Sequence, residues 1–235
     1  MDNLDFNTLE ARRADDSVVA TLMRNVYLWM TAALVITGLT AMLTARSEAL
    51  ISMIFGQSWV WISLMIAEVV LVVWLAARIE KMSFTTATIM FVVYSVINGL
   101  TLSSIFLVYS LGSIEMTFFI AAGMYAAMAL IGSFTKKDLS GIGKFALMAL
   151  IGLIIAMIVN IFIGSAQFDF IISIVGVLVF AGLTAYDSQK IRNSLSMAED
   201  VNDMTMKFAL MGALTLYLDF INIFLYLLRL FGNRK

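Results

Sequence analysis

The chain has 235 residues, of which 62% are hydrophobic and only 13% are charged, and its formal net charge is −1. A water-soluble domain of this length is nearer half apolar and a quarter charged, so the composition predicts a polytopic membrane protein. The charge balance excludes the basic surface of a nucleic-acid-binding protein. Cysteine and histidine are absent, which excludes thiol chemistry and leaves carboxylates as the groups for proton-linked behaviour near neutral pH.

The chain divides into a polar N-terminal tail, residues 1–23, and a single transmembrane domain, residues 24–235. The tail lacks the basic region and early apolar core of a cleavable signal peptide. Each apolar segment after it approaches the ~20 residues that a helix needs to cross a bilayer. The sequence therefore predicts an all-α fold with seven transmembrane helices, at approximately residues 25–45, 58–77, 84–107, 114–135, 142–164, 168–189 and 208–231.

The basic residues predict the orientation of these helices. With the N-terminus in the cytoplasm, the inner side holds eleven of the 15 lysines and arginines, in accordance with the positive-inside rule. These are Arg12, Arg13, Arg24, Arg78, Lys81, Lys136, Lys137, Lys144, Lys190, Arg192 and Lys207. Residues 190–207 are expected to form the longest polar loop. Proline is absent, so any break in a helix is expected at Gly, Ser or Thr.

The last apolar segment, Phe208–Phe231, carries a carboxylate near its middle, Asp219. A charge at the centre of a membrane helix costs about 2.5–3.5 kcal/mol, so Asp219 is expected to face other helices. Small and polar residues share its stripe, because they follow one another at alternating steps of three and four. The stripe consists of Gly212, Thr215, Asp219, Asn222, Tyr226 and Arg229. This seam predicts that the last helix is central in the bundle.

Two further carboxylates lie within apolar segments, Asp187 in the sixth and Glu68 in the second. Asp187 is placed near the cytoplasmic end of its helix, where pairing with Lys190 would explain it equally well. From these spans, the Cα atoms of Asp187 and Asp219 would differ in depth by about 10 Å. The two carboxylates can then meet only if the last helix sits lower or the sixth extends inward.

Glu68 is surrounded by apolar residues and needs a partner, for which Arg229 is a candidate. Arg78 ends the second helix on the cytoplasmic side, where Asp187 also lies. Arg78 is therefore either an ordinary positive-inside anchor or the partner of Asp187 or Asp219 in a salt bridge.

Two segments, LTAYDSQKI and LYLDFINIFLYLLRLFG, resemble the closing two helices of the Bax inhibitor-1 (transmembrane Bax inhibitor motif) family. Length, tail and seven spans also match, so the resemblance covers nearly the whole chain, and LYLDFIN is its most specific part. The resemblance implies a calcium leak regulated by pH through two aspartates, which correspond to Asp187 and Asp219. It also implies that Arg78 latches onto this pair in the closed form, and that Glu68 pairs with Arg229.

The leading hypothesis is thus a pH-sensitive calcium leak channel or slow cation permease of a bacterial inner membrane. Asp187 and Asp219 would supply part of the oxygen shell that Ca²⁺ requires, with Asn222, Thr184 and water as additions. Two close carboxylates also share protons and titrate as a coupled pair. The expected partners are the lipid bilayer, calcium ions and protons; nucleic acid is not expected, and the sequence identifies no protein partner.

Two other classes of function remain open. An intramembrane aspartyl protease also uses a proton-sharing aspartate dyad. Those enzymes carry a Gly-x-Gly-Asp turn and a later Pro-Ala-Leu, whereas this chain has Leu216-Tyr217-Leu218-Asp219 and no proline, so an enzyme is not predicted. A non-conducting scaffold that acts through partners is the third hypothesis.

Overall fold

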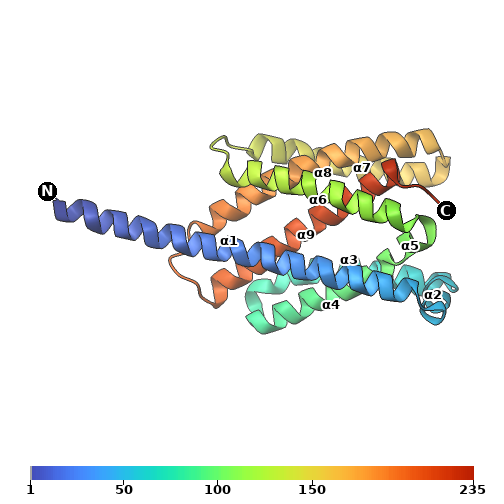
Figure 1. Ribbon diagram of the computed structural model, residues 1–235, viewed down its shortest axis with the longest axis horizontal. Coiled ribbons are helices and arrows are strands. Elements are labelled where there is room, and N and C mark those ends of the chain that lie inside the picture. Colours follow the sequence, from blue (N-terminus) through green and yellow to red (C-terminus); the bar gives the residue numbers. More distant parts are fainter. Residues whose placement is uncertain (1) are drawn as a thin grey trace. The chain divides into compact units, whose positions relative to one another are not determined.

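A computed structural model describes residues 2–235, and most of this range is helical. Seven of the described helices are long and apolar enough to cross a membrane, which confirms the all-α polytopic fold (Figure 1). The long helices are α1 (Asp2–Ala45), α3 (Ser58–Arg78), α4 (Phe84–Leu102), α6 (Leu111–Phe134), α7 (Ser140–Ile163), α8 (Ala166–Leu195) and α9 (Asp203–Phe231). The sequence did not predict the short elements α2 (Glu48–Phe55), η1 (Ile79–Lys81) and α5 (Ser104–Val108).

Several helix ends differ from the predicted ones. The helix α1 begins at Asp2, so it runs through the segment predicted as a polar tail, although its candidate membrane span is Ser17–Ala45. The prediction of a polar loop at 190–207 is wrong in length: the loop is shorter, because α8 continues to Leu195 and α9 begins at Asp203. The division of the chain at residue 23 into tail and domain stays a prediction.

The third span is interrupted without proline, as expected. The helix α4 ends at Leu102, and α5 begins at Ser104. The hydroxyl of Ser103 donates to the carbonyl oxygen of Leu100 at 2.6 Å. A serine hydroxyl that bonds back to the preceding turn competes with the helical backbone bonds, which accounts for a break at this position.

The described residues form two compact units. One contains the chain up to Ser103 together with Ile191–Leu214, and the other contains Ser104–Lys190 and Thr215–Lys235. The helices α8 and α9 therefore each contribute residues to both units. Asp187 and Asp219 belong to the same unit, the second.

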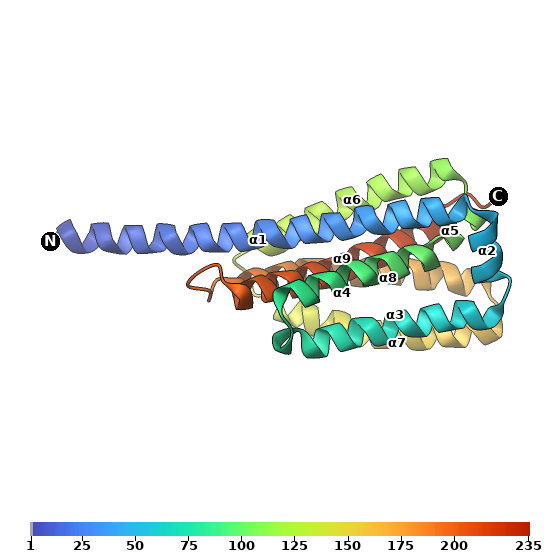
Figure 2. The same ribbon diagram turned by 90° about the horizontal axis from the view of Figure 1, so that it is seen from below.

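In the first unit, α1 lies along α4, and α2 turns the chain back into α3, which packs on α4 as well (Figures 1 and 2). The Thr37 hydroxyl of α1 donates to the Ser95 carbonyl of α4 at 2.9 Å. A Cβ atom added at Gly99 would lie 2.6 Å from the Thr40 side chain. The glycine thus permits the close approach of α1 and α4.

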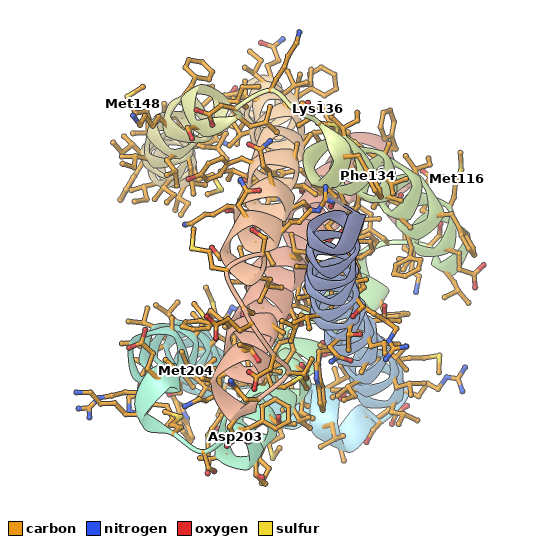
Figure 3. All side chains as sticks on the ribbon, turned by 90° about the vertical axis from the view of Figure 1, so that its left-hand side faces the viewer. Met116, Phe134, Lys136, Met148, Asp203 and Met204 are labelled. Carbon is orange, nitrogen blue, oxygen red and sulfur yellow. The ribbon has the colours of Figure 1, made fainter. Side chains whose placement is uncertain are left out.

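In the second unit, α6 and α7 hold α8. A Cβ atom at Gly132 of α6 would overlap the backbone carbonyl of Ala185, and one at Gly143 of α7 would lie 2.6 Å from the Tyr186 ring. The outer sides of α6 and α7 carry apolar side chains such as Met116 and Met148, which point away from the unit (Figure 3). Backbone contact with α6 therefore fixes the position of α8 just before Asp187.

The C-terminal residues dock onto the α5–α6 connection of the same unit (Figure 1). Arg234 forms an isolated antiparallel bridge with Tyr109. The backbone N–H of Lys235 donates to the Val108 carbonyl at 2.9 Å, and its ammonium group donates to the Phe106 carbonyl at 2.9 Å. The end of the chain thus supplies hydrogen-bond donors to carbonyl groups at the end of α5.

The helix α9 is the most buried of the seven spans, as predicted for a central helix. Gly212, Asp219 and Tyr226 of the predicted seam are buried, whereas Thr215 and Asn222 are half-buried and Arg229 is exposed. The apolar side chains outside the seam are buried as well, namely Leu216, Phe220, Phe224 and Leu227. The helix is therefore buried nearly all round rather than along one stripe. Asp203 and Met204, in its first turn, are labelled in Figure 3.

We predict that Gly132→Ala destabilises the protein, because the added methyl group overlaps backbone of α8 that no side-chain rotation can move. Such overpacking costs about 1–3 kcal/mol. Gly123→Ala on the same helix is the control, since a Cβ atom there meets nothing within 4 Å, and alanine favours a helix by up to about 1 kcal/mol over glycine. Thermal unfolding in detergent should give a lower Tm for Gly132→Ala than for Gly123→Ala; the reverse order would contradict the close α6–α8 contact.

Candidate functional site

Asp219 is the most deeply buried carboxylate of the described side chains. It lies on α9 with only 5% of its surface exposed. Its oxygen Oδ2 is buried and has no hydrogen-bond partner among the described residues. A buried carboxylate oxygen that makes no hydrogen bond within the protein is costly, and such groups occur where a proton, a cation or water is to be bound.

The packing of α8 on α9 brings Asp187 to the level of Asp219. The ring of Tyr226 on α9 stacks on Phe180 of α8, with the centroids 5.9 Å apart. A Cβ atom at Gly176 would lie 2.7 Å from the same Tyr226 ring. Two helical turns back from Tyr226 is Asp219, and two turns forward from Phe180 is Asp187. Since the helices run antiparallel, the two aspartates are level to within about one turn, or 5.4 Å.

This register removes the difference in depth that the predicted spans implied. The sixth span does not end shortly after Asp187, because α8 continues for two further turns to Leu195. Asp187 therefore lies inside its helix rather than at its end. Both helices are longer at this end than predicted, since α8 extends to Leu195 and α9 begins at Asp203.

The two carboxyl groups lie close enough to interact electrostatically. Asp187 is half-buried, and it also interacts with the ammonium group of Lys190, one turn further along α8. Lys190 in turn lies 5.9 Å from the centroid of the Tyr186 ring. Asp187 therefore interacts electrostatically with both Lys190 and Asp219, which were alternative partners in the sequence.

Other oxygen atoms are available near the two aspartates along α8 and α9. The Ser188 hydroxyl is fully buried and has no hydrogen-bond partner among the described residues. The Thr184 hydroxyl donates to the Phe180 carbonyl at 2.8 Å. The Asn222 amide nitrogen donates to the Leu218 carbonyl at 2.8 Å, which leaves its carbonyl oxygen to accept. Ser188 was not identified from the sequence. The one indication in the sequence was that Ser188 is a small polar residue that directly follows Asp187.

The described residues contain no group of three or more carboxylates that could hold a metal ion. The pair Asp187 and Asp219 therefore supplies two charged ligands at most, and any further ligands are neutral oxygens. Such a donor set suits a hard cation, such as Ca²⁺, or protons.

Glu68 and Arg229, which were predicted to pair, each have a partner within their own unit. The Thr101 hydroxyl of α4 donates to the Glu68 carboxylate of α3. Arg229 lies 3.9 Å from the Asp169 carboxylate of α8, and both side chains are more than a third exposed. Such an exposed pair contributes little to stability. The Glu68–Arg229 pair would join the two units and stays a prediction.

Arg78 is the last residue of α3, and its side chain is exposed. The backbone directly after it is held by Lys207, near the start of α9, whose ammonium group donates to the carbonyls of Glu80 at 3.0 Å and Met82 at 3.2 Å. Arg78 belongs to the first unit and the aspartates to the second, so the contact predicted between them stays a prediction.

Comparisons with known proteins extend over almost the entire chain. The protein family described as "Inhibitor of apoptosis-promoting Bax1" matches residues 19–235. The "Inner membrane protein YbhL" of Escherichia coli (strain K12) is 47% identical over 217 residues, which cover 92% of each chain. An uncharacterized protein of Rickettsia prowazekii (strain Madrid E) is 39% identical over 230 residues, which cover 98% of this chain and 97% of the relative.

A similar match extends to an uncharacterized membrane protein of Streptococcus pyogenes serotype M1, which is 38% identical over 193 residues, or 82% of each chain. The family match covers both helices that carry the aspartates, α8 and α9. Two of these relatives are named as membrane proteins, as the seven candidate spans of this chain lead one to expect. The chain therefore belongs to the Bax inhibitor-1 family of membrane proteins.

Proposed function

We propose that the chain is a pH-sensitive calcium leak channel or slow cation permease, in which Asp187 and Asp219 bind the ion in transit. The observation that carries the proposal is the buried oxygen Oδ2 of Asp219, which makes no hydrogen bond among the described residues, in a carboxyl group that interacts electrostatically with a second one, Asp187. Two carboxylates that approach each other in a low dielectric repel each other unless a proton or a cation lies between them. A divalent cation neutralises both.

The donor set favours weak binding and therefore conduction. Ca²⁺ takes six to eight oxygen ligands, and its affinity rises with the number of charged ligands. Two carboxylates, with Ser188, Thr184 and Asn222 as neutral additions, leave part of the shell to water. A conducted ion must be bound well enough to enter and weakly enough to leave, so a site with only two charges suits a slow leak.

Protons compete with calcium for the same oxygens. Calcium requires both carboxylates in the deprotonated form, so binding releases any protons that the pair holds. Histidine is absent from the chain, and the pair is the natural sensor of pH within the membrane. Acidification would fill the site with protons and displace calcium.

Arg78 closes the proposed pathway in the absence of calcium. It would act as the cation that balances the aspartates, and calcium or protons would release it. Glu68 and Arg229 are proposed as supporting charges, which either pair with each other in one state or keep the partners they have here, Thr101 and Asp169.

The bacterial inner membrane is the proposed location, with the N-terminus in the cytoplasm. The Escherichia coli relative is named an inner membrane protein. The orientation rests on the asymmetric distribution of lysine and arginine between the loops. In this orientation the ends of α3 and α8 that carry Arg78 and Lys190 face the cytoplasm.

We predict that Asp187→Asn and Asp219→Asn each lower calcium flux into liposomes by about tenfold or more, because each removes one of two charged ligands. Asparagine keeps the size of aspartate, so the fold should be retained. Glu115→Gln, an exposed acid on α6, is the control and should conduct like the wild type. Wild-type flux in both Asn variants would show that the aspartates are structural, and absence of flux from the wild type itself would favour a scaffold or a protease.

We also predict that calcium affinity falls as the pH is lowered between about pH 8 and pH 5, by up to tenfold per pH unit for each proton released. The sign follows from competition, since the deprotonated pair binds calcium and the protonated pair does not. Equilibrium dialysis with radioactive calcium at several pH values measures the slope. Asp219→Asn can release fewer protons, so its slope should be shallower; a slope independent of pH in the wild type would contradict the mechanism.

Removal of the proposed closing residue should have the opposite effect on flux. Arg78→Ala is expected to raise the calcium leak at neutral pH and low calcium by about fivefold, the size of a typical coupling between two states. Lys81→Ala is the matched control, because Lys81 is an exposed cation at the end of the following η1 turn. An equal increase in both variants would indicate a change in surface charge rather than the loss of a latch.

A further inference from the structure

We propose that Gln189 is a positioning residue, which holds the α6–α7 loop and thereby fixes the rotation of α8 that turns Asp187 toward α9. The inference deepens the proposed function, because it assigns a residue that sets the geometry of the same aspartate pair. The contact itself lies entirely within the second unit, and it can be tested whether or not the protein conducts calcium.

The carboxamide of Gln189 binds two backbone groups of the loop at once. Its oxygen Oε1 accepts from the N–H of Leu139 at 2.9 Å, and its nitrogen Nε2 donates to the carbonyl of Lys137 at 2.8 Å. Because the carboxamide accepts one hydrogen bond and donates another, it fixes the orientation of the loop relative to α8 as well as the distance between them. The Leu139 side chain is buried beside this contact, so the loop is anchored by both polar and apolar contacts.

The loop that Gln189 holds is internally ordered. Asp138 accepts from the backbone N–H of Ser140 at 2.9 Å and from its hydroxyl at 2.6 Å, and these bonds lower the pKa of the Asp138 carboxyl. The N–H of Lys137 donates to the Thr135 hydroxyl at 3.3 Å. A loop with its polar groups satisfied in this way is a fixed support rather than a mobile tether.

The contacts of α8 with its support lie on faces other than the one that carries Asp187. Successive residues of a helix are separated by about 100°, so Gln189 and Ala185 lie about 160° from Asp187, on the opposite face. Ala185 is in contact with Gly132 of α6, and Tyr186 is in contact with Gly143 of α7. These two contacts set how closely α8 packs on its neighbours, but neither is a directional hydrogen bond. Gln189 adds the directional contact that prevents rotation, and the face opposite to it carries Asp187.

Cysteine cross-linking tests this rotation directly, because the chain has no cysteine of its own. The double variant Asp187→Cys/Asp219→Cys should form an intramolecular disulfide under mild oxidation. Adding Gln189→Met, which keeps the length but abolishes both hydrogen bonds, should slow cross-linking by about tenfold or more, since a disulfide requires Cβ atoms within about 4.5 Å. Gln167→Met, at an exposed glutamine near the other end of α8, is the control and should leave the rate unchanged.

Hydrogen–deuterium exchange and calcium binding complete the test in the single variants. Gln189→Met should raise exchange at the Leu139 amide, which loses its acceptor, and Gln189→Glu should retain part of the protection because a carboxylate still accepts but cannot donate. In the wild-type aspartate background, Gln189→Met should flatten the pH dependence of calcium binding, whereas Gln167→Met should not. The unfolding temperature of each variant separates this effect from a general loss of stability.

Equal cross-linking rates with and without Gln189→Met would overturn the proposal. This holds even if hydrogen exchange at the Leu139 amide rises, because the loop contact would then be lost without any change in the position of residue 187. If wild-type protein bound no calcium while Gln189→Met still slowed cross-linking, the positioning role would stand and the proposed function would fail. If calcium binding were present and its pH profile unchanged in Gln189→Met, the function would stand and the positioning role would fail.

Discussion

A carboxylate in a low-dielectric interior must be neutralised, hydrogen-bonded or hydrated, and the position of Asp219 makes this the central constraint of the second unit. The side chain is almost fully buried, and one of its oxygens has no hydrogen-bond partner among the described residues. A protein that needed only stability would place an apolar residue there. The chain instead brings a second carboxylate, Asp187, into electrostatic contact. This arrangement raises the cost further unless a proton or cation is bound, and for that reason we regard the pair as functional.

Two other ionisable groups within the spans, Glu68 and Arg229, are accommodated in different ways. Glu68 accepts a hydrogen bond from the Thr101 hydroxyl on the neighbouring helix, which compensates part of its desolvation. Arg229 lies near the end of α9, where it remains exposed, forms an ion pair with Asp169 and lies 5.4 Å from the centroid of the Tyr226 ring. Both solutions are local and static. Asp219 differs from both because its compensation within the described protein is incomplete.

The packing behind α8 explains how two facing aspartates can be held in place despite their repulsion. Gly132 admits the α8 backbone against α6, Gly143 admits the Tyr186 ring against α7, and Gln189 ties the helix to the α6–α7 loop. Each contact lies on the side of α8 away from Asp187 or next to it. Close contacts on the other faces thus hold α8 against any repulsion between the two carboxyl groups.

Composition and periodicity determined the all-α fold, the seven spans and the burial of the last helix, because a bilayer requires long apolar helices and penalises any charge within them. The family followed from the resemblance of two segments, LTAYDSQKI and LYLDFINIFLYLLRLFG, to its closing helices. The two candidate aspartates also followed from the sequence. Helix ends did not, since polar residues such as Lys190 and Arg192 continue a helix as readily as they end it, and the distance of Asp187 from the end of its helix was therefore underestimated. The partners of Glu68 and Arg229, and the role of Gln189, required the tertiary structure. Hydrogen bonds between residues more than thirty positions apart depend on the register of neighbouring helices, and no local pattern in the chain encodes that register.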